Sequence, residues 1–477
     1  MRVLRVAISL LLAATLACPN SPLIESHDIC DGRVCDAAGF ADAPAADGAA
    51  PDGQADDTTP GDAGVAQDMS AADARRSDLS TLDTATLDSA APDTSIPVDA
   101  ARPDFGGSCP ALIDRIQVTE TDLSPDRIDL TNGDYFAPAK PVLLSTHAAG
   151  ASVAWADSSD TVHVNVLSAD DRAVGAHHTL SGRAVRGLVA HADGHGLLVR
   201  GADARDDQMF LVRLDASGGV VFDLTIVGDN THEEAGDKWI DTWSHEGRLA
   251  WSGDTYGAYF GHTGNHGANG NHQGDFLGYY DAQGNQTSGG WGWGCSHSVD
   301  LRLQHNGNRF GPVCLSDCYP GLGFYFNHNS LVFNEPTGDC RGATDGRLGG
   351  LVPTTDGFLL SFAAPEGRAS RDVALVHISD SVDVGTPIWL TDSAGVDESA
   401  PHLARLGDQL LLGWKEGGDH VLAVVDEAGT FLEGPVTVPV RFAALDDFVT
   451  FSNGDAGWAY AWDDLSLLKV VRVIPCG

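Results

Sequence analysis

The stretch LVPTTDGFLLSF, residues 351–362, places two short apolar runs on either side of a polar turn that ends in Gly357. A glycine that follows Asp supplies the positive backbone φ that tight hairpins require, so this stretch predicts a β-hairpin. The same arrangement returns in LARLGDQLLLGW at 403–414 and in VTFSNGDAGWAYAW at 449–462. We interpret these stretches as copies of one structural unit.

Similar turn glycines recur throughout the C-terminal part of the chain, between 44 and 60 residues apart. We assign the first hairpin of each unit to Gly150, Gly194, Gly247, Gly307, Gly357, Gly407 and Gly454. A second hairpin follows in several units, at Asp215, Asp281 and Asp426. Four strands in about 45 residues are the content of one propeller blade. The sequence therefore predicts an all-β fold, a β-propeller of seven four-stranded blades over 109–477, with six or eight blades as the alternatives.

The last unit, 448–477, supplies only three strands, although a propeller must join its last blade to its first. We expect the segment 112–123 to provide the missing outer strand. Cys109 and Cys476 would then meet at this seam and form a disulfide, worth about 5 kcal/mol in the chain-entropy model.

The N-terminus, MRVLRVAISLLLAATLACPN, places Arg2 and Arg5 ahead of an apolar run over 6–17. This run is shorter than the roughly 20 residues that cross a bilayer. A positive flank, a short apolar stretch and a small residue before a cysteine are typical of an export signal, which we place at 1–17.

The stretch Thr15-Leu16-Ala17-Cys18 resembles the lipobox of bacterial lipoproteins. The resemblance implies that Cys18 carries the acyl chains that hold the protein on a membrane; simple cleavage after Ala17, giving a free secreted protein, is the alternative. Pro19 stands where an Asp would resemble an inner-membrane retention signal, which favours an outer-membrane lipoprotein of the cell envelope. The sequence leaves open whether it faces the periplasm or the cell surface.

The chain has nine cysteines, and lipidation of Cys18 leaves eight, an even number that suits four disulfides in an oxidising compartment. Cys30 and Cys35 would close a small loop. The rest of 18–108 is rich in Ala, Asp, Pro and Gly and lacks apolar residues to bury, so we expect a disordered acidic tether. The formal net charge of −39 opposes binding to nucleic acid. We expect a monomer, and the propeller region resembles secreted bacterial propeller repeat proteins.

The third unit carries an insertion that breaks the regular spacing. We interpret 254–274 as a loop between its second and third strands and 288–295 as a blade-to-blade loop, which emerge on the same face of a propeller. Imidazole and carboxylate groups there are ligands that zinc and copper accept, although loop histidines are also common as plain polar residues. The candidate metal ligands are His262, His266, His272, Asp275, His297 and Asp317.

The same loops offer two tryptophans in the sequence Gly-Trp-Gly-Trp-Gly, suited to stacking on sugar rings or apolar side chains. The alternative is that both rings pack between blades. The candidate ligand-binding residues are Trp291, Trp293, Asn265, Asn269, Asn271 and Gln273.

Four further cysteines surround these loops. If His305-Asn306-Gly307-Asn308 forms a two-residue turn, Cys295 lies opposite Cys318, and Cys314 is left to pair with Cys340. A zinc site formed by Cys314, Cys318 and His297 is the alternative.

The sequence contains no G-x-S-x-G elbow, no H-E-x-x-H motif and no phosphate-binding glycine loop, and it identifies no catalytic residue. We therefore favour a non-catalytic module that binds a glycan or a protein on its loop-bearing face. The alternative is a metal-dependent hydrolase or lyase that uses the histidines of that face.

Overall fold

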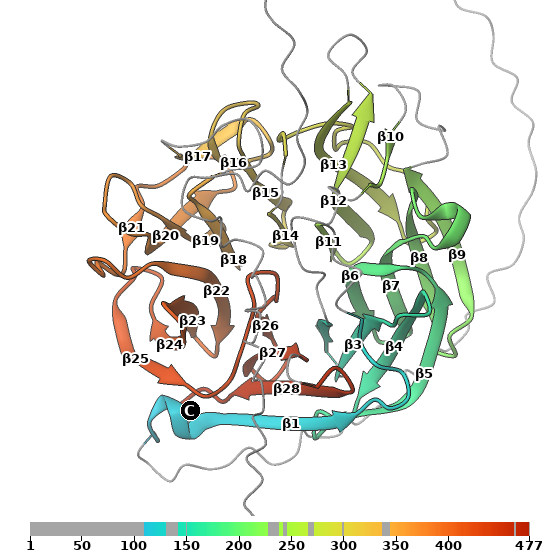
Figure 1. Cartoon of the computed structure of the whole chain (residues 1–477), viewed down its shortest axis with the longest axis horizontal. Helices are drawn as coiled ribbons and strands as arrows, with labels where there is room; N and C mark the ends of the chain where they lie inside the picture. The colour runs from blue at the N-terminus through green and yellow to red at the C-terminus, as the bar shows by residue number, and fades with distance from the viewer. Residues whose placement is uncertain are drawn as a thin grey trace, which may run out of the picture. The chain divides into compact units, whose positions relative to one another are not determined.

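The computed structural model describes residues 109–129, 142–148, 150–227, 238–241, 246–265, 271–297, 300–335, 344–461 and 464–476. These residues form seven four-stranded antiparallel sheets arranged as blades around a central axis, as predicted (Figure 1). Helical structure is limited here to two short 3-10 turns, η1 (Leu112–Arg115) and η2 (Asp203–Arg205). Within the described ranges, the chain contains no helix with the length and apolar character needed to cross a bilayer.

Six of the seven blades begin with their innermost strand. The first two blades comprise β2 (Leu143–His147), β3 (Gly150–Ala156), β4 (Thr161–Leu167), β5 (Ala173–Ser181), β6 (Ala184–His191), β7 (Gly194–Arg200), β8 (Met209–Asp215) and β9 (Val220–Val227). The third comprises β10 (Lys238–Trp239), β11 (Gly247–Trp251), β12 (Thr255–Asn265) and β13 (Asn271–Asp281). Here β11 is the innermost strand, and the short β10 pairs with another part of β12. The fourth comprises β14 (Leu301–His305), β15 (Phe310–Ser316), β16 (Gly323–Phe326) and β17 (Ser330–Asn334).

The fifth blade comprises β18 (Arg347–Thr354), β19 (Gly357–Ala364), β20 (Asp372–Ser379) and β21 (Ile388–Trp389). The sixth comprises β22 (Glu398–Leu406), β23 (Gln409–Glu416), β24 (Asp419–Val425) and β25 (Phe431–Val438). The seventh comprises β26 (Val449–Thr450), β27 (Ala456–Tyr460), β28 (Leu467–Val473) and β1 (Ile116–Asp122).

The seventh blade closes the ring in the predicted way. β1, from the start of the folded region, pairs antiparallel with β28 from its end, with Ile116 opposite Val473 and Asp122 opposite Leu467. The disulfide between Cys109 and Cys476 lies beside this seam and confirms the predicted pairing. The buried Arg115 adds a hydrogen bond of 2.8 Å to the carbonyl oxygen of Ile474.

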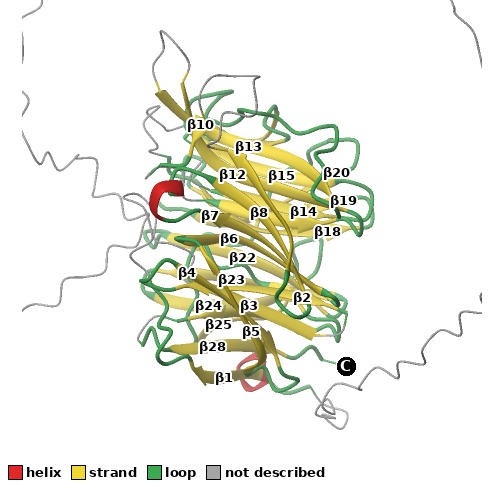
Figure 2. Ribbon diagram, turned by 90° about the vertical axis from the view of Figure 1, so that its right-hand side faces the viewer, coloured by secondary structure: helices red, strands yellow, loops and turns green. Residues whose placement is uncertain are grey.

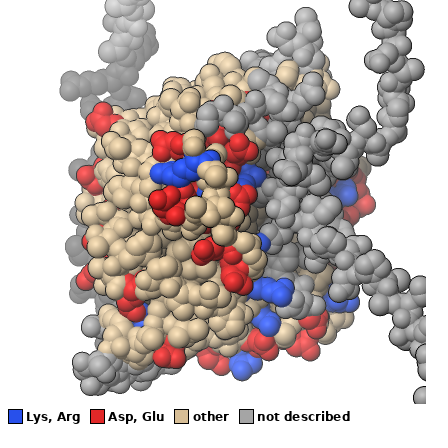
Figure 3. All heavy atoms as spheres, turned by 60° about the vertical axis from the view of Figure 1, so that its left-hand side comes forward, with Lys and Arg blue, Asp and Glu red and all other residues tan. Residues whose placement is uncertain are grey.

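The apolar core is divided among the blade interfaces. Seven clusters of buried side chains each join two neighbouring blades, including the pair formed by the first and the seventh. In one of them, Trp458 is fully buried and stacks on Phe448, with ring centroids 4.3 Å apart. The sheets therefore face one another around the ring (Figure 2). Acidic side chains are prominent on the face shown in Figure 3.

Six of the seven predicted glycines lie in or beside the turn between the two innermost strands of a blade. Gly247 does not, and that assignment is wrong. It begins the innermost strand β11, and the turn of this blade lies at 252–254. A Cβ atom at Gly247 would lie 2.7 Å from the Cβ of Arg186 on β6, so the residue must be small because two innermost strands approach each other closely.

The insertion of the third blade is also not the predicted loop. β12 and β13 form one long hairpin, paired from Thr255 opposite Asp281 to Asn265 opposite Asn271. Most of 254–274 is therefore strand, because its glycines make room for neighbouring rings instead of forming turns. A Cβ at Gly274, for example, would lie 2.3 Å from the indole nitrogen of Trp293.

The predicted pairing of Cys295 with Cys318 is wrong, and so is that of Cys314 with Cys340. Cys295 is bonded to Cys314, because the turn after β14 has four residues instead of two and Leu301 lies opposite Cys314. The side-chain oxygen of Asn306 stabilises this longer turn by accepting hydrogen bonds from two backbone N–H groups of the turn. Cys318 is also in a disulfide, so neither it nor Cys314 is a metal ligand. Cys18, Cys30, Cys35 and Cys340 lie outside the described residues.

Candidate functional site

The predicted residues of the loop-bearing face divide into two groups instead of one. One group surrounds Asp275 on β13, and the other surrounds Asp317, which follows β15. His266 and Asn269 lie outside the described residues. His262 is fully buried on β12, and its Nε2 donates a hydrogen bond of 2.9 Å to the carbonyl oxygen of Gly292.

Asp275 is fully buried and accepts three hydrogen bonds. The donors are the hydroxyl of Tyr259 at 2.9 Å, the indole of Trp291 at 2.6 Å and the backbone N–H of Cys295 at 3.2 Å. Burial raises the pKa of Asp275 to about 7, although these hydrogen bonds act in the opposite direction. The carboxyl group therefore holds the blade-to-blade segment 291–295 onto β13.

Asp317 forms the second group. Its carboxylate accepts a hydrogen bond of 2.9 Å from the hydroxyl of Ser296 and lies 3.0 Å from Nδ1 of His297. His272 is the second residue of β13, and the centroid of its ring lies 5.9 Å from that of His297. Of the described candidate ligands, no three bring their ligand atoms within 4.8 Å of one another; Asp275 does so only with Cys295 and Cys314, whose sulfurs are joined.

The aromatic residues of this face are packed to different degrees. Trp291 is half-buried, and it contacts His328 edge-on at 4.3 Å in addition to its bond to Asp275. Trp293 is also half-buried and lies 5.4 Å from Tyr319, whose side chain is 57% exposed. Asn265 and Asn271 are exposed at the ends of their strands, and Gln273 is half-buried. Trp293 and Tyr319 thus form the aromatic pair that the face offers to solvent.

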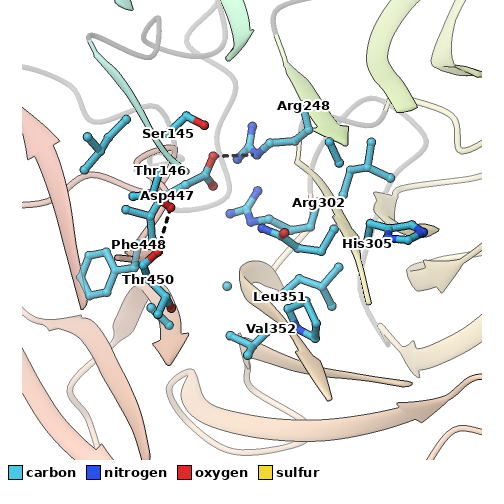
Figure 4. Close-up of a pocket in the computed structure, with 18 of the residues that line it drawn as sticks. Ser145, Thr146, Arg248, Arg302, His305, Leu351, Val352, Asp447, Phe448 and Thr450 are labelled. Carbon is cyan, nitrogen blue, oxygen red and sulfur yellow. Dashed lines mark hydrogen bonds and ion pairs between the residues drawn. The ribbon is translucent and has the colours of Figure 1, made fainter. Parts of the chain in front are cut away.

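A cavity of about 600 Å³ lies inside the ring and is lined by the innermost strand of every blade. Apolar side chains such as Leu144, Leu249 and Leu351 form part of its wall. Figure 4 shows the guanidinium groups of Arg248 and Arg302 directed into the cavity from one wall, toward Asp447 on the other. Both arginines stand near the start of an innermost strand, on β11 and β14.

Arg248 is buried but not fully hydrogen-bonded. Its Nη1 donates to Glu246 at 2.7 Å and to the carbonyl of Gly247 at 2.9 Å, and its Nε lies 3.1 Å from the carboxylate of Asp447. Burial opposes the charge, but the carboxylates of Asp447 and Glu246 outweigh it and raise the pKa of Arg248. Its Nη2 is buried and has no hydrogen-bond partner. An orphaned charged donor of this kind is costly unless a ligand or water supplies an acceptor.

Arg302 is held by the backbone of the next blade. Its Nε donates to the carbonyl of Gly349 at 2.6 Å, and its Nη2 to that of Leu348 at 3.2 Å. These carbonyls are available because β18 has a bulge between Leu348 and Leu351, where the ladder with β19 is interrupted. The bulge therefore fixes one guanidinium group at the cavity wall.

His402 on β22 lines the same cavity and is neutral at physiological pH. Burial lowers its pKa to about 3, and its Nε2 donates a hydrogen bond of 2.9 Å to the carbonyl of Ala443. Its ring stacks on Phe448 at 4.7 Å. It acts as a fixed part of the wall.

The sequence interpretation missed the cavity. A signal was present, since Glu246 and Arg248 stand two residues apart at the start of one inner strand, and Asp300 and Arg302 repeat this spacing in the next blade. Because the chain has only 28 Lys and Arg residues, an acid–arginine pair that recurs at equivalent positions of two blades indicates a shared site at the inner strands.

No family model matches the chain, and no curated protein matches it. Among solved structures, it is similar to BBS1N in complex with ARL6DN, with 8% identity, a TM-score of 0.39 and coverage of 68% of this chain and 87% of that one. It is also similar to Sqt1 of Saccharomyces cerevisiae, with 12% identity, a TM-score of 0.36 and coverage of 75% of this chain and 98% of that one. A puromycin-hydrolysing peptidase of Mycobacterium tuberculosis matches with 12% identity, a TM-score of 0.41 and coverage of 71% of this chain and 50% of that one. The TM-scores are low, so the fold is assigned here from the strand pairing itself.

Proposed function

We propose that this chain is an exported, lipid-anchored binding protein, and that its propeller takes a small ligand with an oxygen acceptor into the central cavity. The observation that carries the proposal is the buried Nη2 of Arg248, a charged donor at the cavity wall with no hydrogen-bond partner. A carboxylate or hydroxyl oxygen of a ligand would satisfy it.

The dimensions and fixed walls support binding. A cavity of about 600 Å³ is within the range that accommodates small molecules. Arg248 and Arg302 are each held by several bonds to neighbouring groups, so little side-chain entropy is lost when a ligand arrives. A larger partner, such as a glycan chain or a protein, would in addition meet the exposed Tyr319 beside Trp293 on the loop-bearing face.

Calorimetric titration of the full chain with succinate and with N-acetylglucosamine tests the cavity and separates an acid from a neutral sugar. Arg248→Lys keeps the positive charge but removes the planar guanidinium group and its paired N–H donors. We therefore expect the affinity for the bound compound to fall about 10- to 100-fold, as for the loss of one charged hydrogen bond. Arg183→Met, which removes a half-exposed arginine of the second blade, is the matched control and should bind normally. Equal affinity in Arg248→Lys and wild type, or no binding of either compound, would argue against the cavity site.

The anchor is a separate part of the proposal and rests on the signal-like 1–17 and on Cys18. Cells that express the full chain should incorporate labelled palmitate into it, and Cys18→Ala should abolish the label and move the protein out of the membrane fraction. Cys30→Ala should leave the label unchanged. Label that persists in Cys18→Ala, or its absence from the wild type, rejects lipidation. A density gradient and added protease would then locate the protein at the outer membrane and on one of its sides.

A further inference from the structure

A group of polar side chains on the first blade is separate from the candidate residues of the third and fourth blades and does not line the central cavity. Asp126, His163 and His177 each offer one ligand atom, and these atoms all lie within 4.8 Å of one another. His163 is on β4, His177 is on β5, and Asp126 belongs to the segment that leaves β1. The sequence interpretation placed metal ligands only on the third and fourth blades and did not consider these three residues.

Strand register brings the two histidines together. His163 lies opposite Thr179 and Asn165 lies opposite His177, so the histidines are diagonal neighbours on one face of the β4–β5 pair. Nδ1 of His163 is 2.8 Å from Nε2 of His177. His163 is buried and His177 is exposed, so the pair is open to solvent on one side.

Asp157 fixes the protonation of the buried histidine. Its Oδ2 lies 2.8 Å from Nε2 of His163, and its Oδ1 accepts bonds from the backbone N–H and hydroxyl of Ser159 and from the backbone N–H of Thr161. Asp157 is therefore an acceptor, and Nε2 of His163 carries the proton. The lone pair of His163 is left on Nδ1, directed toward His177. A carboxylate that orients a histidine from behind is the usual companion of a metal-binding imidazole.

Trp155 positions all three residues. Its ring stacks on His163 at 5.2 Å and on His177 at 6.1 Å. Its indole N–H donates a hydrogen bond of 3.1 Å to the backbone carbonyl of Asp126, so the same side chain that supports the imidazoles holds the acidic residue beside them. Trp155 is only 1% exposed, so this support is rigid.

We propose that Asp126, His163 and His177 bind one divalent transition-metal ion of the zinc class, through a carboxylate oxygen, Nδ1 and Nε2, with water in the remaining position. Two imidazoles and one carboxylate are a ligand set that zinc accepts. Nitrogens bound to tetrahedral zinc are about 3.3 Å apart, so binding requires the two rings to separate by roughly 0.5 Å. The exposed His177 can make this adjustment.

The position of this site would let a bound ion link the first blade to the seventh. The segment of Asp126 continues from β1, and Ile128 donates a backbone hydrogen bond of 2.9 Å to Leu465 in the seventh blade. An ion at this site would therefore tie the seam of the ring to the outer strands of the first blade. The inference does not depend on ligand binding in the central cavity.

The test is titration of the full chain, purified without a polyhistidine tag, with zinc sulfate, followed by calorimetry and by elemental analysis after dialysis. We expect one equivalent of zinc per chain and a rise in melting temperature. His177→Gln and Asp126→Asn should remove that equivalent, and Asp157→Asn should weaken it about 10- to 100-fold, as the loss of an orienting carboxylate does at known sites. Cobalt(II) should give visible d–d absorption bands in the wild type that are lost in His177→Gln.

His377→Gln is the matched control, because His377 also lies 3.1 Å from an aspartate, Asp356, but has no second histidine beside it in the described structure. It should bind zinc like the wild type. Circular dichroism checks that each variant is folded. If the wild type binds no zinc, or if His177→Gln and Asp126→Asn retain the equivalent, the proposal is overturned and the two histidines form only a hydrogen bond to each other.

Discussion

Asp275 lies beneath the loop-bearing face, where three donors converge on a carboxyl group that solvent does not reach. Its pKa rises from the ordinary value of about 4 for an aspartate to about 7 because burial disfavours the charged form. Between these values the folded protein holds a proton that the unfolded chain has released. The stability associated with this proton is therefore fully present below about pH 4 and is lost as the pH rises through 7.

Asp275→Asn removes this titration without changing the size of the side chain. We expect the free energy of unfolding of the wild type, relative to this variant, to fall by up to about 4 kcal/mol between pH 4 and pH 7. Denaturant unfolding at several pH values measures it. Parallel curves for the two proteins would show that Asp275 does not titrate in this range.

At the residue scale, the sequence selected side chains by type but could not assign their contacts. The sequence pattern indicates a ligand platform at Trp291 and a metal ligand at Asp275, yet the structure joins the two in one partly buried hydrogen bond. Arg248 was not chosen, because its value as a site residue depends on where seven strands converge. No local pattern records that geometry.

At the scale of elements, the recurrent glycines differ in what they do. Gly307 has a φ of 93° in the turn after β14, and a Cβ there would meet no other atom. Gly150 begins β3, beside the corresponding turn of the first blade, but is not among the residues with positive φ, and a Cβ there would meet only the ring of His147 at 3.7 Å. The need for glycine at Gly307 is therefore purely conformational.

We expect Gly307→Ala to lower the free energy of unfolding by about 1–2 kcal/mol, because a side chain disfavours the left-handed region. Gly150→Ala should have no effect or raise stability by less than about 1 kcal/mol, since alanine restricts the unfolded chain at a compatible position. Urea denaturation of the two variants checks the difference. Similar losses in both would contradict a conformational origin.

The elements most open to prediction were those with a local signature. Asp215, Asp281 and Asp426 each begin a turn in which the carboxylate accepts a backbone N–H four residues later, as their shared Asp-x-x-Gly pattern indicates. Gly247 and the glycines of β12 and β13 misled the sequence interpretation, because close packing and a turn both require the same residue. The disulfide partner of Cys295 was missed for a related reason, since two added turn residues shift the register of a whole hairpin.

At the scale of the whole molecule, two disulfides constrain very different lengths of chain. Cys109 and Cys476 are 367 residues apart, whereas Cys295 and Cys314 are 19 residues apart. In the chain-entropy model these loops contribute about 5–6 and about 3 kcal/mol. Replacing both cysteines of the first pair by serine should therefore lower the unfolding free energy by more than the same change in the second pair, as measured by denaturant titration. An equal or smaller loss at the seam would show that the closed ring does not depend on its covalent link.

The order of features along the chain places Cys109 between the acidic segment 18–108 and β1. If the far end of that segment is held on a membrane, tension on the protein arrives first at Cys109. It is then shared between the backbone that leads into β1 and the bond to Cys476, three residues beyond the end of β28. The force therefore reaches β1 and β28 at the same end of the seam, so it does not separate β1 from β28 one hydrogen bond at a time. A load on the proposed anchor would therefore not open the ring at its seam.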